Sequence, residues 1–264
     1  MTMVGNTIST LSCAVDGGVA LMTFNNPPVN MLTPAILNEL ETTLETLAKD
    51  DSVKVLIMTG AGRVFIAGAD IKVIAAIQSA RQGMDMAARG QNILNKVESF
   101  EKPIIAAING MCLGGGLELA MCCHIRVAGE GARFGQPEIN LGIIPGFGGT
   151  QRLPRLIGPS KALEMILTGD VLSATDAKAA GLVSHVMPQD DLLRQAQGLA
   201  KRIASKGQVA VRAALRAVRH GMDVSLSEGL LQEARLFGEL CETRDKQEGV
   251  AAFLEKRHPQ FTNQ

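Results

Sequence analysis

PIIAAINGMCLGGGLELA, residues 103–120, is the stretch on which the fold of this chain depends. Residues 104–108 form a short apolar run rich in β-branched side chains, bounded by Pro103 and an Asn-Gly pair, and such a run predicts a buried strand. Three consecutive glycines follow, and residues 117–123 are good helix-forming sequence. We therefore expect a strand that leads through a glycine turn into the N-terminus of a helix.

The expected helix N-terminus is a candidate site for negative charge. Its first backbone N–H groups have no partner within the helix, and the glycines let a ligand approach them closely. Such groups can hold an anion, or an oxyanion that develops during a reaction. Glu118 lies one turn into this helix, where its carboxylate is a candidate proton carrier.

Three interpretations of the triple glycine stay open from these residues alone. The glycines could form a tight turn packed against a neighbouring element, which their conformational freedom also permits. A dinucleotide site is disfavoured, because the pattern G-x-G-x-x-G is absent here. The third interpretation is a catalytic oxyanion hole, and the rest of the chain has to decide among the three.

The composition indicates a globular protein and argues against nucleic-acid binding. With 264 residues, of which 46% are hydrophobic, the chain can bury a sizeable core. Basic and acidic residues balance at 26 each, so charge gives no reason to expect nucleic acid. Trp and Tyr are absent and only 8 Phe are present, which leaves little material for base stacking.

Cysteine usage favours a reducing, cytoplasmic compartment. The five cysteines show no C-x-x-C spacing, so neither a zinc site nor a disulfide framework is expected. The histidines show no arrangement with Cys, Asp or Glu that suggests a metal site. Residues 1–16 carry no basic residue and no long apolar core, and we expect no signal or transit peptide there. No apolar run approaches the roughly 18 residues of a membrane span.

The order of the remaining patterns predicts an α/β fold. A hairpin is expected over residues 8–15 and 19–24, around an Asp-Gly-Gly turn. Further strands are expected at residues 53–59, 64–67, 104–108, 125–128, 132–134 and 183–186. Helices are expected at residues 34–47, directly after residue 72, and at residues 91–100, 117–123, 151–157, 161–167 and 173–181. Residues 79–89 are polar and glycine-bearing, and we expect a mobile connection there.

Two regions are expected along the chain. Residues 1–190 carry the alternating strands and helices, and we expect them to form the core that holds the active site. Residues 191–264 are helical in pattern, with breaks near Gly207, Gly221 and Thr243. Several amphipathic helices need a partner surface, either the core or another subunit, and we expect a helical oligomerisation region.

Glu138 is a second candidate proton carrier. It lies between a proline and apolar residues, where a carboxyl can be buried and its pKa raised. Its position alone favours a solvated loop glutamate over such a buried group.

Four motifs in one order resemble the enoyl-CoA hydratase (crotonase) family. They are AGADIK at residues 67–72, GGGLELA at 114–120, FGQPEINLG at 134–142 and IPGFGGTQRL at 144–153. The resemblance runs from about residue 15 to residue 257, which is nearly the whole chain. It implies a crotonase-type spiral of strand–strand–helix units, followed by a C-terminal helical trimerisation region. A homotrimer or homohexamer is the assembly that this implies.

The same resemblance implies the catalytic residues. The backbone N–H groups of Ala69 and Gly115 would form an oxyanion hole for a thioester carbonyl. Glu118 and Glu138 would hold one water and serve as base and acid for its addition across a C2–C3 double bond. Two carboxylates around one water are not easily both charged, so their pKa values should separate.

A substrate-binding set is implied in the same way. Lys72 would lie near the phosphates of coenzyme A (CoA). Phe253 and Lys256 match C-terminal positions that approach CoA, often across a subunit boundary. The remaining members of the expected set are Ala67, Gly68, Asp70, Ile71 and Gly114. His124 stands where many family members have Asp, and we interpret it as structural; Cys112 is interpreted as a packing residue.

The implied activity is hydration of a trans-2-enoyl-CoA to a 3-hydroxyacyl-CoA, with no separate cofactor because CoA is part of the substrate. A Δ3-Δ2-enoyl-CoA isomerase is the alternative, and it needs one main proton carrier and no bound water. The presence of both glutamates favours hydration. A non-catalytic RNA-binding member of the fold is a third class, which the zero net charge and the scarcity of aromatic residues disfavour.

Overall fold

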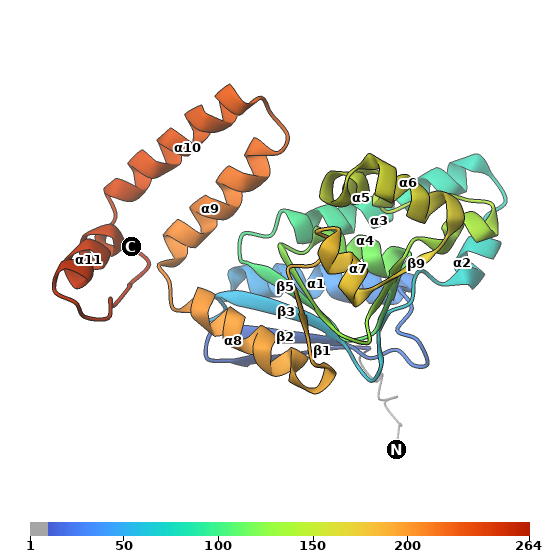
Figure 1. Ribbon diagram of the computed structural model, residues 1–264, viewed down its shortest axis with the longest axis horizontal. Coiled ribbons are helices and arrows are strands. Elements are labelled where there is room, and N and C mark those ends of the chain that lie inside the picture. Colours follow the sequence, from blue (N-terminus) through green and yellow to red (C-terminus); the bar gives the residue numbers. More distant parts are fainter. Residues whose placement is uncertain (1–9) are drawn as a thin grey trace, which may run out of the picture.

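The computed structural model describes residues 10–264, which form two sheets surrounded by helices and a helical arm (Figure 1). The larger sheet has the strand order β1-β2-β3-β5-β7-β10. Its strands are β1 (Leu11–Asp16), β2 (Val19–Phe24), β3 (Val55–Gly60), β5 (Ile104–Ile108), β7 (Ile125–Gly129) and β10 (His185–Met187). Only β1 and β2 pair antiparallel in this sheet, as the predicted hairpin; residues 8 and 9 of that prediction lie outside the described residues.

The smaller sheet is built from short strands in the order β4-β6-β8-β9. They are β4 (Val64–Ile66), β6 (Met111–Leu113), β8 (Arg133–Gly135) and β9 (Val171–Ser173). From β3 to β8 the chain alternates between the two sheets: β3 is followed by β4, β5 by β6, and β7 by β8. The predicted spiral of strand–strand–helix units is therefore confirmed.

Glycines form two of the corners at which the chain passes from one sheet to the other. A Cβ atom at Gly60 would overlap the carbonyl oxygen of Val64, and one at Gly110 would overlap that of Arg63. The Asn109 side chain joins these corners, because its Nδ2 donates to the carbonyl oxygen of Gly60 at 2.9 Å and its Oδ1 accepts from the Gly60 N–H at 3.1 Å. Close approach of two backbones thus requires glycine at both corners.

Helices cover both faces of the larger sheet. The helices of the core are α1 (Pro34–Lys49), α2 (Ile71–Ala75), α3 (Ala80–Glu98), α4 (Gly115–Cys122), α5 (Gly149–Ile157), α6 (Pro159–Thr168), α7 (Ala174–Ala179) and α8 (Leu192–Ala204), with 3-10 turns η1 (Pro137–Leu141) and η2 (Gln189–Asp191). None of the helices within residues 10–264 combines the length and apolar character needed to cross a bilayer.

The prediction of a mobile connection at residues 79–89 is wrong, because these residues form the first half of α3. Ser79 caps the helix by accepting a hydrogen bond from the Gln82 N–H at 3.3 Å. The second half of the helix is anchored by the buried side chains of Ile93, Leu94 and Val97. The polar residues before them form exposed helix surface, and that gave this half the composition of a loop.

The C-terminal region divides after α8. Ala196 and Ala200 on α8 pack against the larger sheet, next to residues such as Ile105. The helices α9 (Gln208–Gly221), α10 (Leu226–Cys241) and α11 (Arg244–Leu254) then extend away from the core as an arm (Figure 1). Neither cluster of buried apolar residues found within residues 10–264 includes a residue of this arm. The division of the chain at residue 190 into two domains stays a prediction.

Candidate active site

The three glycines lie at the N-terminus of α4, as predicted, and each meets a different constraint. Gly114 has a φ of 50°, which favours glycine. A Cβ at Gly116 would overlap the carbonyl oxygen of Ile66 on β4, so α4 begins in direct contact with that strand. At Gly115 a Cβ would lie 3.5 Å from the backbone nitrogen of Ala69.

The structure therefore brings Ala69 and Gly115 together, although 46 positions separate them in the sequence. A bridge to Leu32 holds Ala69: the Leu32 N–H donates to the carbonyl oxygen of Gly68 at 2.8 Å, and the Asp70 N–H donates to that of Leu32 at 3.3 Å. Within residues 10–264, neither the Ala69 N–H nor the Gly115 N–H donates to another group. Two neighbouring free donors are the geometry that an oxyanion hole requires.

Glu118 is buried beside these donors, with 2% of its surface exposed. Its Oε1 accepts hydrogen bonds from the N–H groups of Phe147 at 2.8 Å and Gly149 at 2.7 Å. The pKa of this carboxyl is raised to about 7, mainly by burial and also by the charge of Glu138, against the lowering effect of the two amides and of Arg152. A carboxyl with a pKa near neutrality can both take up and release a proton.

Glu138 comes to the same place from the turn η1. A Cβ at Gly114 would lie 2.7 Å from Oε1 of Glu138, so this carboxylate is next to the start of α4. Its Oε2 is buried and has no hydrogen-bond partner among the residues described. Burial raises the pKa of this carboxyl as well. Glu138 is therefore half-buried with one oxygen fully enclosed, and it is not the fully solvated loop residue that its position alone favoured.

Gln136 is a further polar residue of the site, which the sequence did not single out. Its side chain is fully buried, and neither its Nε2 nor its Oε1 finds a partner within the described part of the chain. A Cβ at Gly149 would lie 3.1 Å from the Gln136 amide carbon and 3.0 Å from Oε1 of Glu118. Buried polar groups are usually hydrogen-bonded, so Gln136 is suited to a polar group of a substrate or a water.

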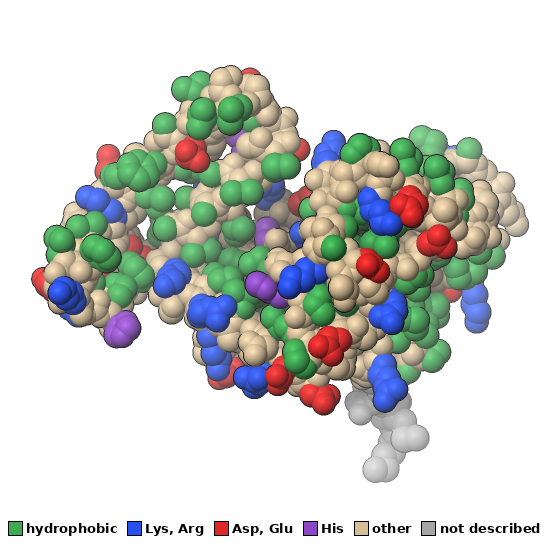
Figure 2. Space-filling view, in the orientation of Figure 1, with side chains coloured by type: hydrophobic (Ala, Val, Ile, Leu, Met, Phe, Trp, Pro, Cys, Tyr) green, Lys and Arg blue, Asp and Glu red, His purple; other side chains and the backbone are tan. Residues whose placement is uncertain are grey.

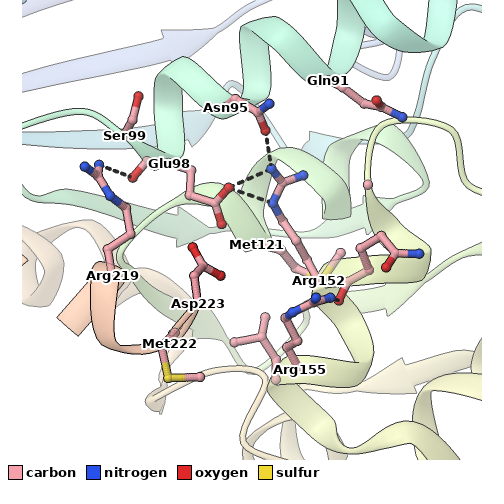
Figure 3. Close-up of a pocket in the computed structure, with 13 residues that line it drawn as sticks. Gln91, Asn95, Glu98, Ser99, Met121, Arg152, Arg155, Arg219, Met222 and Asp223 are labelled. Atoms are coloured by element: carbon pink, nitrogen blue, oxygen red, sulfur yellow. Dashed lines mark hydrogen bonds and ion pairs between the residues drawn. The ribbon is translucent and has the colours of Figure 1, made fainter. Parts of the chain in front are cut away.

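Arg152 on α5 holds the loop whose amides bind Glu118. Its Nη1 donates to the carbonyl oxygen of Phe147 at 3.0 Å, and its Nη2 pairs with Glu98 and with Asn95, each at 2.7 Å (Figure 3). The Arg152 side chain thus ties the loop to α3. Arg152 belongs to the motif at residues 144–153, but the sequence around it indicates no role for its side chain.

Arg152, Glu98 and Asn95 line one side of a cavity of about 620 Å³, which lies between α3, α5 and the end of α9 (Figure 3). Its charged lining residues are Glu98, Arg152, Arg155, Arg219 and Asp223. Met121, one turn beyond Glu118 on α4, also lines it, but neither glutamate of the site does. The cavity therefore lies next to the candidate active site and is separate from it.

The remaining expected residues are divided between two places. Residues 67–72 lead from β4 into α2; the Asp70 side chain caps this helix by accepting from the Lys72 N–H at 2.9 Å, and the Lys72 side chain is exposed. Phe253 is 84% exposed at the end of α11, and Lys256 follows it. Figure 1 shows α11 at the opposite end of the molecule from α2, so the structure does not bring Phe253 and Lys256 to the site of the same chain.

His124 connects elements of the fold, in agreement with the structural interpretation. Its Nδ1 accepts from the Ile104 N–H at 2.9 Å, at the start of the central strand β5. Burial, followed by the charge of Arg219, lowers the pKa of this imidazole to about 4. Cys112 is buried, and burial raises the pKa of its thiol well above the usual value, which fits a packing role. Within residues 10–264 no three His, Cys, Asp or Glu side chains are grouped as metal ligands.

Residues 14–264 match the family model described as enoyl-CoA hydratase/isomerase. The chain belongs to this family. It is 46% identical over 255 residues to a Bacillus subtilis protein named probable enoyl-CoA hydratase, a match covering 96% of this chain and 99% of that protein. It is 44% identical over 245 residues to a Syntrophomonas wolfei protein named crotonyl-CoA hydratase, covering 92% and 94% of the two chains.

The fold of the family is shared as well. The crystal structure of an enoyl-CoA hydratase from Bacillus anthracis superposes with a TM-score of 0.93 at 40% identity, covering 97% of this chain and 100% of that one. Both the sheets and the C-terminal helices thus agree with a known enoyl-CoA hydratase/isomerase fold.

Proposed function

We propose that this protein is an enoyl-CoA hydratase, which adds water across the C2–C3 double bond of a trans-2-enoyl-CoA to give a 3-hydroxyacyl-CoA. The observation that carries the proposal is the meeting of buried Glu118 and half-buried Glu138 with two free N–H donors at the start of α4. The hydratase names of full-length relatives support the same activity.

In this proposal the thioester carbonyl oxygen accepts from the N–H groups of Ala69 and Gly115. One carboxyl takes a proton from water as the water oxygen bonds to C3, and the electron pair of the double bond moves toward the carbonyl oxygen. The two N–H donors stabilise the enolate that results; losing one such donor typically costs roughly 2.7–4 kcal/mol. The second carboxyl, in its protonated form, then delivers a proton to C2.

The environment of the glutamates supports this division of roles. Both carboxyls have raised pKa values, because burial penalises their charged forms. Since each carboxylate also disfavours ionisation of the other, one of the pair can stay protonated near neutral pH while the other is charged. The unpaired Oε2 of Glu138 is a free acceptor for the water.

CoA would bind through residues from two copies of the chain. The exposed Lys72 is suited to meet a phosphate from the same chain as the glutamates. Phe253 and Lys256 lie at the far end of their own chain, so they would have to come from a neighbouring copy.

The arm supplies the surface for such an assembly, which we propose is a homotrimer or homohexamer. Figure 2 shows hydrophobic side chains along the arm, and several of them are exposed in a single chain. They include Val218, Met222, Leu226, Leu230, Leu231, Phe237, Phe253 and Leu254. An exposed apolar surface of this kind marks an interface, and the arm has no apolar core of its own among the described residues. A reducing, cytoplasmic compartment stays an expectation from the sequence.

The direct test is to add crotonyl-CoA to the purified protein and follow the loss of the absorbance of the conjugated thioester. A hydratase converts crotonyl-CoA to 3-hydroxybutyryl-CoA, and the absorbance decreases because the conjugated double bond is lost. Absorbance that stays constant at catalytic enzyme concentrations would refute the proposal.

A further inference from the structure

Phe147 connects three parts of the candidate active site. Its N–H donates to Glu118, and its ring lies 3.6 Å from the position that a Cβ of Gly115 would occupy. The ring is 4% exposed and packs on α3 at Gly90, where a Cβ atom would overlap three of its carbons. The ring thus lies next to Gly115, in a space that exists only because residue 90 is glycine, while the backbone N–H of the same residue binds Glu118.

The proposed chemistry defines the direction of the acyl chain. The thioester oxygen lies at the N–H groups of Ala69 and Gly115, and C2 and C3 must lie between the two glutamates. Carbons from C4 onward would then extend past Glu118 toward residues 145–149, the loop whose Phe147 and Gly149 amides bind that carboxyl. The ring of Phe147 is the large apolar group of that loop and faces α3 at this point.

The loop is held in place, so the ring has little freedom to swing aside. The Gln91 Nε2 donates to the carbonyl oxygen of Gly146 at 2.8 Å, and Arg152 donates to that of Phe147 at 3.0 Å. A Cβ at Gly146 would be in ordinary contact, at 3.9 Å, with the Cβ of Ala87. Contacts with both α3 and α5 therefore fix the backbone on either side of the ring.

We propose that Phe147, packed on Gly90, closes the distal end of the acyl pocket and restricts the enzyme to short 2-enoyl chains. The proposal rests on the hydratase function and specifies its substrate class. Phe147 acts by the volume of its ring, while its backbone N–H positions Glu118. The combination of a bulky residue at position 147 and a glycine at position 90 determines the acyl chain length that the enzyme accepts.

The test is a chain-length series of trans-2-enoyl-CoA substrates from C4 to C12, measured as kcat/KM with the wild-type protein and with Phe147→Ala. The alanine keeps the backbone N–H that binds Glu118 and removes the ring. A methylene that a closed pocket excludes typically costs about 10–200-fold in kcat/KM. We expect the wild-type activity to fall steeply beyond short chains, and the C8-to-C4 ratio of kcat/KM to rise at least about tenfold in Phe147→Ala.

Two further variants test whether a changed chain-length profile comes from the lost ring or from a general loosening of the fold. Leu156→Ala removes a half-buried apolar side chain on the other side of the network, in the cavity of Figure 3, and should leave the chain-length profile unchanged. Phe147→Leu removes less volume and should move the profile in the same direction by a smaller amount. It keeps the proposal testable if Phe147→Ala does not fold.

Gly90→Ala tests the contact between the Phe147 ring and α3. On the wild-type background the new Cβ overlaps the ring, so thermal stability and kcat/KM for crotonyl-CoA should both fall. On the Phe147→Ala background the overlap is gone, and the same change should be nearly neutral in both measurements. A chain-length profile that is identical in wild type and Phe147 variants would overturn the proposal while hydration of crotonyl-CoA stands. A wild-type protein that hydrates no member of the series would instead refute the function itself.

Discussion

Replacing Glu118 by Gln should make the folded protein more stable above pH 7 while it removes most of the activity. Gln keeps the shape of the side chain, and its carbonyl oxygen can still accept from the N–H groups of Phe147 and Gly149. What it removes is the cost of holding a charge at a site that is 2% exposed. The prediction thus links a catalytic property of Glu118 to the free energy of unfolding.

The magnitude follows from the pKa of Glu118, which burial raises from 4.5 to about 7 in the folded chain. Because the folded pKa is the higher one, the folded state binds more protons than the unfolded state between these two values. The stabilising contribution is complete below pH 4.5 and is lost as the pH rises through 7. Each pH unit in this window is worth about 1.4 kcal/mol, so the wild-type protein loses roughly 3 kcal/mol from this group by pH 8.5.

The assay is urea denaturation of wild type and Glu118→Gln at pH 5 and pH 8.5, at one protomer concentration, because an oligomer's stability depends on it. The stability advantage of the variant should be larger at pH 8.5 than at pH 5 by roughly 2–3 kcal/mol. Glu130→Gln, at an exposed position, is the control for losing one negative charge. An advantage of the same size at both pH values would refute the reasoning, since it would mean that Glu118 is not held protonated by its burial.

Further predictions follow from the site and the arm. Glu118→Gln and Glu138→Gln should each lower the kcat of hydration by roughly 10²–10⁴ with little change in KM. Because the two residues act as a unit, the loss of kcat in the double variant should be far smaller than the product of the two single losses. An isomerase would instead lose double-bond migration through one substitution only. Lys72→Ala and Lys256→Ala should raise KM for crotonyl-CoA more than they lower kcat, and an unchanged KM in both would remove their assignment to CoA. Arg152→Met removes a positive charge that lowers the pKa of Glu118, so the inflection that Glu118 produces in the pH profile of kcat/KM should move to higher pH. A pH profile identical to that of wild type would contradict this role of Arg152. Light scattering at micromolar concentration should give the mass of a trimer or hexamer, and a monomeric mass would refute the assembly.

Features that depend only on neighbouring residues could be predicted from the amino-acid sequence. The run at 104–108 and the triple glycine predict strand β5 and the start of α4 because β-branched residues and glycines act on their own backbone. Thr33, with a proline next to it, begins α1 for the same reason. The four motifs, in their order, identified the family that the comparisons confirm.

Local composition was misleading where the decisive contacts are distant. Residues 79–89 have the composition of a loop, yet they are helical because a cap at Ser79 and the buried side chains that follow commit the whole segment to α3. The three-residue strands β6 and β9 were not predicted, although the equally short β4 and β8 were, and they are held by pairing with partners elsewhere in the chain. The sequence pattern after residue 190 likewise did not separate α8, which covers the larger sheet, from the arm.

The geometry of the candidate active site depends on contacts between distant parts of the chain. Ala69 and Gly115 are adjacent donors because Leu32 holds one and β4 supports the helix that carries the other. The pKa of Glu118 is about 7 because the fold buries this carboxyl, and burial raises the pKa by more than the hydrogen bonds from Phe147 and Gly149, about thirty positions away in the chain, lower it. Desolvation and hydrogen bonding depend on everything within a few ångströms, and those neighbours are set by the packing of the whole chain and not by adjacent residues.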